Sequence, residues 1–138
     1  MMVTMKMVGN LIVCDDKNAV SLINPQNMQK VASIALPNQN CYLYSVYFHS
    51  LSKTIFLGFD DKKIIGIDSE RYTLKSNMTM NEPCLKFTPY HADPENFAIM
   101  ACDRGIIKIF QPARNMISAT FDIEQAIIDE QRQQNNDE

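Results

Sequence analysis

The feature that most constrains this chain is a hairpin-like pattern that occurs three times at nearly equal spacing. In each copy, an apolar run leads into an acidic turn and then into a second apolar run. The second run alternates with period two, which predicts a strand that buries one face. The copies are Leu11–Ile23, Phe56–Asp68 and Ala98–Phe110. The expected core-facing pairs in their second strands are Val20 and Leu22, Ile65 and Ile67, and Ile107 and Ile109.

Acidic residues mark the turn of each hairpin. Asp16, Asp61 and Asp103 are separated by 45 and 42 residues, which is close to the length of a four-stranded propeller repeat. An aspartate carboxylate accepts hydrogen bonds from nearby backbone N–H groups and so favours a tight turn. Gly105 in the third copy tolerates a positive φ. We therefore expect Asp16, Asp61, Asp103 and Gly105 to be structural turn residues.

Two further short strands flank each hairpin, one upstream and one downstream. Each repeat is then expected to hold four strands joined by turns rich in proline, asparagine and serine. The upstream strands are Val3–Val8, Tyr42–Phe48 and Cys84–Phe87, and the downstream strands are Lys30–Leu36, Tyr72–Met78 and Met116–Phe121.

Short strands at regular spacing predict an all-β fold. A long period with four strands per unit favours β-propeller blades, whereas a seven-stranded sandwich does not explain why the acidic turn recurs. The chain is therefore expected to form about three blades of four antiparallel strands in an incomplete ring. The expected blades lie at residues 3–37, 41–79 and 83–121, with a helix and acidic tail at 122–138.

The third repeat carries the clearest resemblance to a known family. Cys84–Pro89 followed by Phe97–Phe110 resembles WD-repeat β-propellers, in which a valine-x-phenylalanine-x-proline strand precedes a hairpin with an Asp-Gly turn and a final aromatic residue. The second repeat matches with Val46–Phe48 and Asp60-Asp61, and the first matches mainly in its hairpin. The resemblance covers about residues 3–121.

The chain departs from this family in two respects. It has no tryptophan, and no Gly-His dipeptide precedes any repeat. Phe110 and Ile67-Asp68 stand where the Trp-Asp pair of the family would be. These departures leave the subfamily open.

Three blades do not close a ring, since propellers have about four to eight blades. An open arc leaves a sheet edge and an inter-blade face exposed. Three arrangements follow: a part of a longer propeller, a ring completed by another chain, or a ring closed by copies of this chain. We favour a terminal portion of a larger propeller or a subunit of an assembly.

The charge distribution argues against direct binding of nucleic acid or of an anionic membrane. The net charge is −3, and the segment from Ile123 onward alone carries five acids and one base. The remainder is nearly neutral and has no basic footprint. The uncharged stretch Val31–Ser52 contains too many polar residues for a lipid-facing helix.

The cysteines indicate a reducing, intracellular protein, either cytoplasmic or nuclear. Cys14, Cys84 and Cys102 lie in or beside apolar runs, as small buried residues do. No cysteines are paired as C-x-x-C, so no zinc site is expected. The chain also shows no pattern of a secretory signal.

A helix is expected after the last blade. Asp122 and Gln125 form the pattern of a capping box, and Ile123, Ala126 and Ile127 follow at helical spacing. This predicts about three helical turns that fade from Gln133 onward. We expect the helix to fold back over an edge or face of the propeller, and the alternative is an amphipathic helix that docks in a partner's groove.

The chain contains no motif of a catalytic or cofactor-binding site. P-loop, dinucleotide-binding, nucleophile-elbow and zinc-protease patterns are absent. The acid pairs Asp15-Asp16 and Asp60-Asp61 are explained by turns, and His49 and His91 are expected to be solvated loop residues. No enzyme activity, metal or cofactor is therefore expected.

The resemblance implies a scaffold that binds other proteins as part of a multi-subunit assembly. In the family, one face is built by the tight hairpin turns and the loops between blades. On this chain, the residues of that face expected to bind a partner are Lys62, Lys63, Arg104 and Tyr42. Two other classes of function remain open. One is a ribonucleoprotein-associated subunit that contacts RNA, and the other is an enzyme with a site on a propeller face.

Three tyrosines share one expected strand. Alternation places Tyr42 and Tyr44 on one face and Tyr47 on the other. Exposed tyrosines are good interface anchors. We expect at least one of the three to be buried between blades.

Overall fold

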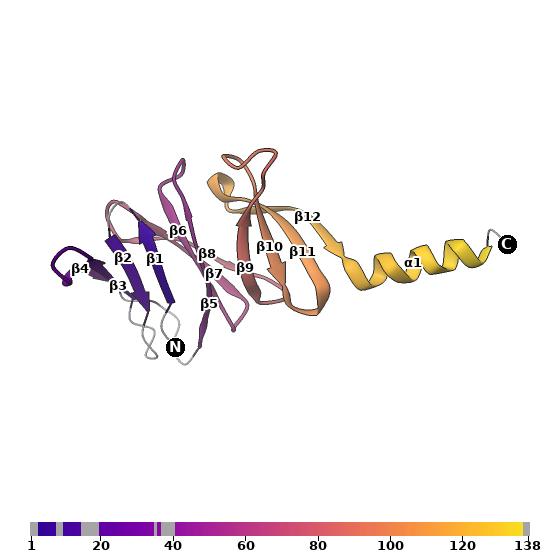
Figure 1. The fold of residues 1–138 in the computed structure, drawn as a ribbon, viewed down its shortest axis with the longest axis horizontal. Coiled ribbons are helices and arrows are strands. Elements are labelled where there is room, and N and C mark those ends of the chain that lie inside the picture. The colour runs from indigo at the N-terminus through magenta and orange to yellow at the C-terminus, as the bar shows by residue number, and fades with distance from the viewer. Residues whose placement is uncertain (1–2, 8–9, 15–19, 35, 37–40, 137–138) are drawn as a thin grey trace.

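The computed structural model describes residues 3–7, 10–14, 20–34, 36 and 41–136. Within these ranges the chain forms twelve strands, two short 3-10 turns and one helix (Figure 1). The strands are β1 (Val3–Met7), β2 (Asn10–Cys14), β3 (Val20–Asn24), β4 (Gln29–Ile34), β5 (Leu43–His49), β6 (Thr54–Phe59), β7 (Lys63–Asp68), β8 (Leu74–Thr79), β9 (Cys84–Pro89), β10 (Ala98–Cys102), β11 (Ile106–Gln111) and β12 (Met116–Asp122), and the helix is α1 (Ile123–Asn136).

The strands form three separate antiparallel sheets of four. Their orders are β1-β2-β3-β4, β5-β6-β7-β8 and β9-β10-β11-β12, so every strand pairs with its neighbour in sequence. We call these sheets blade 1, blade 2 and blade 3. Contacts between blades are concentrated between β1 and β5 and between β5 and β9, the first strand of each blade. The expected all-β fold, with propeller blades in an incomplete ring, is confirmed.

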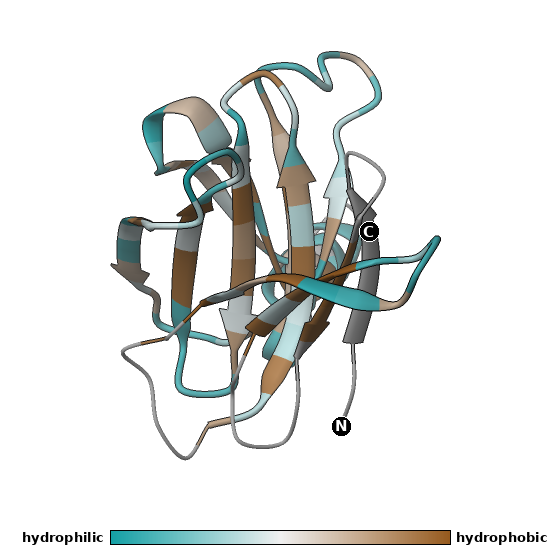
Figure 2. Cartoon of the chain, turned by 90° about the vertical axis from the view of Figure 1, so that its left-hand side faces the viewer, coloured by the Kyte–Doolittle hydropathy of each residue, from teal (hydrophilic) through white to brown (hydrophobic). Residues whose placement is uncertain are grey.

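Two hydrophobic clusters hold the blades together, one on each side of blade 2. The apolar residues lie mainly on the strands, and the hydrophilic residues lie on the connecting loops (Figure 2). Because blade 2 packs on both faces, all six residues of β6 are buried, as are Ile64–Ile67 of β7. The cluster between blades 1 and 2 includes Ile12, Val20, Leu22, Ile55, Leu57 and Ile67, and the cluster between blades 2 and 3 includes Phe56, Ile64, Cys84, Phe87, Met100 and Phe110.

Aromatic contacts link blade 2 to blade 3. The rings of Phe56 and Phe110 meet edge to face with centroids 5.0 Å apart, a favoured arrangement for aromatic pairs. Tyr47 stacks on Phe87 at 5.6 Å, and burial raises the pKa of Tyr47. Tyr42 and Tyr44 are exposed, so Tyr47 is the tyrosine of this strand that lies between blades.

The prediction that His49 is solvated is wrong. Its side chain is buried at the end of β5, where Nδ1 accepts hydrogen bonds from the Ser52 backbone N–H (3.2 Å) and hydroxyl (2.6 Å). Nε2 therefore carries the proton and donates to the Glu95 carbonyl of blade 3, at 2.5 Å. The sequence predicts a surface position for a histidine near a turn, but the adjacent blade covers this one. His91 is exposed.

The expected core pair Ile107 and Ile109 is also wrong. In β11 the buried residues are Lys108 and Phe110, which face blade 2, while Ile107 and Ile109 are half-buried on the opposite face. Residues of both faces are apolar along this strand, so alternation alone does not say which face packs. In blade 1, Val20 and Leu22 are buried as expected.

The C-terminal helix is longer and more separate than expected. It extends through Asn136 and points away from blade 3 (Figure 1), and all its residues from 123 to 135 are exposed. The Asp122 carboxylate accepts the Gln125 backbone N–H at 3.0 Å, as an N-cap does. The Gln125 side chain donates to Asp129 at 3.0 Å instead of closing the capping box. The expected folding back over the propeller is therefore wrong.

Candidate partner-binding surface

The tight turns of blades 2 and 3 are tied to the strand that starts each blade. The Asp60 N–H donates to the Tyr42 carbonyl at 2.9 Å, and the Asp103 N–H donates to the Pro83 carbonyl at 3.3 Å. Asp60 and Asp103 therefore hold equivalent positions, 43 residues apart. The Asp60 carboxylate also accepts the Tyr42 N–H at 2.8 Å. The alignment of Asp61 with Asp103 was off by one residue, because two adjacent aspartates leave the register undecided.

The turn residues predicted from the sequence lie at these turns. The Asp61 carboxylate accepts the Lys63 N–H at 3.2 Å, and the Asp103 carboxylate accepts the Arg104 N–H at 2.9 Å. Gly105 has a φ of 72°. Asp16, the turn residue predicted for the first repeat, lies outside the described residues.

Opposite stability changes are expected at Gly105 and Lys62, two of the three left-handed positions in these turns; the third is Arg104, with a φ of 61°. Lys62 has a φ of 70° and is the counterpart of Gly105. Gly105→Ala should destabilise the protein by about 1 kcal/mol, and Lys62→Gly should stabilise it by up to about 1 kcal/mol, because glycine adopts this conformation without a steric cost. Equilibrium unfolding in urea measures both. Equal shifts of the same sign would contradict the prediction.

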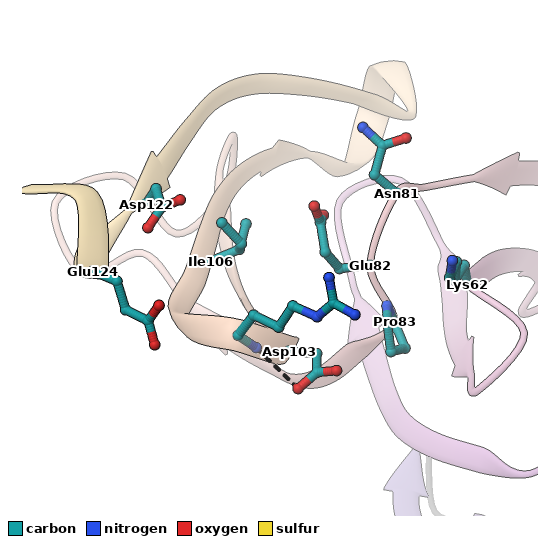
Figure 3. Close-up of a pocket in the computed structure, with 9 residues that line it drawn as sticks. Lys62, Asn81, Glu82, Pro83, Asp103, Ile106, Asp122 and Glu124 are labelled. Atoms are coloured by element: carbon teal, nitrogen blue, oxygen red, sulfur yellow. Dashed lines mark hydrogen bonds between the residues drawn. The ribbon is translucent and has the colours of Figure 1, made fainter.

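A cavity of about 350 Å³ opens at this end of the molecule, between blades 2 and 3. We call it the turn pocket. Its walls come from the β6–β7 turn, the connection between β8 and β9, the β10–β11 turn, and the junction of β12 with α1 (Figure 3). The lining residues are Lys62, Asn81, Glu82, Pro83, Asp103, Arg104, Ile106, Asp122 and Glu124.

A largely buried ion pair anchors one wall of the turn pocket. Lys108 of β11 contacts Glu82 with its Nζ 2.9 Å from Oε2, and the two side chains are 8% and 22% exposed. A buried ammonium group is costly unless it is paired, so this contact holds the β8–β9 connection against blade 3. Because Lys108 neutralises Glu82, the other charged groups of the pocket are the carboxylates of Asp103, Asp122 and Glu124 and the cations of Lys62 and Arg104.

The pocket brings together two of the four residues predicted to bind a partner. Lys62 and Arg104, 42 residues apart in the sequence, both line it. Lys63 and Tyr42 do not. Lys63 begins β7 and is half-buried, while Tyr42 is 58% exposed at the foot of β5.

Sequence reasoning missed the acidic side of the pocket. Asp122 was identified only as a helix cap, and Glu82 and Glu124 were not singled out. The available signal for Glu82 is its place inside the loop between blades, residues 80–83. The pairing of Glu82 with Lys108 could not be predicted, because a lysine within an apolar strand is expected to face solvent.

Two cysteines pair across β9 and β10, next in sequence to the pocket residues Pro83 and Asp103. Cys84 and Cys102 are register partners on β9 and β10, and both are buried. The Cys84 thiol hydrogen-bonds to Cys102 and so lowers the pKa of Cys102, while this bond and burial raise the pKa of Cys84. Cys41 is buried as well. The expected role of Cys84 and Cys102 as small packing residues agrees with this placement, and Cys14 has no described side chain.

Two kinds of feature are absent from the described part of the chain. No cluster of three or more histidine, cysteine or acidic side chains is arranged to hold a metal ion there. No helix within those same ranges is long and apolar enough to cross a membrane.

Comparisons with known proteins identify the fold. No protein-family model matches the sequence, and neither does any curated protein. Among solved structures, the chain is similar to the Pan2 WD40 domain of Neurospora crassa, with a TM-score of 0.71, 13% identity, and coverage of 86% of this chain and 35% of that one.

Two further solved structures give the same result. Sqt1 of Saccharomyces cerevisiae has a TM-score of 0.68 at 11% identity, with 81% of this chain and 30% of that one covered. Raptor of Chaetomium thermophilum has a TM-score of 0.73 at 14% identity, with 88% and 12% covered. The chain thus spans between 12% and 35% of the length of these structures. Its fold is that of a three-bladed portion of a WD40-like β-propeller.

Proposed function

We propose that the protein is a non-enzymatic scaffold that binds other proteins within a multi-subunit assembly, and that the turn pocket contacts the partner. One observation carries this proposal: segments from blade 2, blade 3 and α1 converge on a single cavity that presents both signs of charge. The WD40-like fold supports it by analogy alone, since one fold serves many functions.

The chemistry of the pocket suits a segment of a partner protein. Its volume lies in the range of small-ligand sites, enough for one or two side chains. Lys62 and Arg104 offer cations, while Asp122 and Glu124 offer carboxylates, so a charged segment is held in one orientation. The buried cysteines described above support an intracellular, reducing compartment for this binding.

The test is a charge reversal at the pocket. The double variant Lys62→Glu/Arg104→Glu should lower recovery of the partner at least about tenfold, equal to a loss of about 1.4 kcal/mol of binding free energy. The measurement is quantitative affinity capture from cell extract with the tagged full chain. Thermal unfolding of both forms establishes that the variant is folded.

The matched control reverses two cations that lie away from the pocket. Lys30 on β4 and Arg71 between β7 and β8 are exposed and do not line the cavity. Lys30→Glu/Arg71→Glu makes the same change in net charge, and it should leave recovery unchanged. Recovery of the same proteins in equal amounts by the pocket variant and by the original chain would overturn the proposal.

A further inference from the structure

Each blade has two distinct faces, and each face repeats position by position. We call the face turned towards the following blade the out-face and the other the in-face. On the out-face, Ile12, Phe56 and Ile99 hold one position in blades 1, 2 and 3, according to the strand registers. A second out-face position is held by Val20, Ile64 and Ile107 in the same registers.

The out-face of blade 3 is uncovered. Ile12, Val20, Phe56 and Ile64 are at most 1% exposed because the next blade covers them. Their counterparts Ile99 and Ile107 are only half-buried. Phe121, which pairs with Ile107 across β11 and β12, is 56% exposed. The out-face of blade 3 is therefore an apolar surface of the kind that the next blade covers in blades 1 and 2, but here no blade covers it.

The in-face of blade 1 is uncovered as well, and it is the kind of face that an out-face packs against inside the chain. Its residues Leu11, Val13 and Ile23 hold the positions of Ile55, Leu57 and Ile67 in blade 2. Those blade 2 residues pack against blade 1 and are at most 1% exposed, whereas Leu11, Val13 and Ile23 are half-buried. The described chain therefore carries an unmatched out-face at one end and an unmatched in-face at the other.

The apolar surface of blade 3 continues onto the helix. Phe121, Ile123, Ala126 and Ile127 line one shallow cavity between β12 and α1. The helix leaves the sheet on the side away from blade 2 (Figure 1), which is the side of the uncovered out-face. Lys86 also lies on this face, as the register partner of Ala101, and its long side chain can extend to solvent at the rim.

We propose that two copies of this chain associate head to tail, with the out-face of blade 3 in one copy packed on the in-face of blade 1 in the other. The contact repeats the one that blade 2 makes with blade 3 inside the chain. Two such junctions join six blades, a number at which propellers close. A closed pair avoids the open filament that a head-to-tail contact otherwise builds.

Light scattering of the purified full chain tests this proposal. The expected mass is twice 15.8 kDa, in a single species with a β-type circular dichroism spectrum. Ile107→Asp on the out-face and Ile23→Asp on the in-face should each halve the mass and leave the spectrum unchanged. Asn77→Asp, at an exposed position of β8, adds the same charge and should leave the mass unaltered.

Mixing the two variants distinguishes this head-to-tail contact from one in which the same face of both copies meets. Because each variant keeps one intact face, an equimolar mixture of Ile107→Asp and Ile23→Asp should again give twice 15.8 kDa through one junction. A mixture that stays at the single-chain mass overturns the proposal. An original chain that is monomeric, or that forms larger open assemblies, overturns it too. The turn pocket opens between blades 2 and 3 and shares Asp122 with the cavity beside α1, so its test substitutes Lys62 and Arg104, which the proposed junction does not use.

Discussion

Replacing Phe110 by alanine is expected to lower the free energy of unfolding by about 3–5 kcal/mol. Phe110 is fully buried and packs edge to face on Phe56 of the neighbouring blade, with a further ring contact to Phe87 at 6.3 Å. The truncation removes these contacts and leaves a cavity between two sheets that pack on each other through a shared hydrophobic cluster. Equilibrium unfolding in urea, followed by circular dichroism, measures the loss.

The control for this substitution is Tyr44→Ala. Tyr44 is also aromatic, but it is 42% exposed, so its removal should cost less than about 1 kcal/mol. Domains of this size are stable by about 5–15 kcal/mol, so Phe110→Ala should remove a large share of the stability. Similar small losses for both variants would contradict the packing of blade 2 on blade 3 described here.

Gly58→Ala is expected to destabilise the protein by about 2–4 kcal/mol, because it combines overpacking with a broken hydrogen bond. A Cβ at this position would lie 2.3 Å from Ser45 Oγ and 3.2 Å from the Cys84 carbonyl oxygen. The Ser45 hydroxyl donates to that carbonyl at 3.1 Å and joins blade 2 to blade 3. The added methyl group displaces the hydroxyl and leaves a buried carbonyl without its donor.

A double-mutant cycle with Ser45→Ala tests this mechanism. Removing the hydroxyl costs one hydrogen bond, but it also makes room for the new methyl group. The double variant should therefore be at least about 1 kcal/mol more stable than the sum of the single losses predicts. Additive losses in urea unfolding would show that the hydroxyl is not what the methyl group meets.

Several features of the fold were predictable from local patterns. Alternating apolar residues identified the strands, and the acidic turns set the repeat near 43 residues, because both depend on neighbours close in sequence. Asp122 was recognised as a helix cap for the same reason, and its hydrogen bond to Gln125 is local. Features that depend on which blade covers which face were predicted poorly.

His49 and Lys108 illustrate that limit. Both are polar residues at positions where local rules expect solvent. His49 is buried because Glu95, from a loop 46 residues further on, accepts its ring N–H. Lys108 is buried because Glu82 supplies the countercharge and blade 2 covers the strand. A sequence pattern cannot identify Glu95 or Glu82 as these partners, because neither lies at a short, regular spacing from the residue it contacts.

The sequence by itself determined the all-β class, the three repeats of four strands and the turns between them. Those properties follow from hydrogen bonds and side-chain alternation within a few residues. Only the tertiary structure decided that Phe110 rather than Ile109 faces the neighbouring blade, that the helix stands away from the propeller, and that Lys62 and Arg104 share a pocket. The physical reason is that burial is set by the packing of whole sheets, and residues of both faces are apolar in these strands.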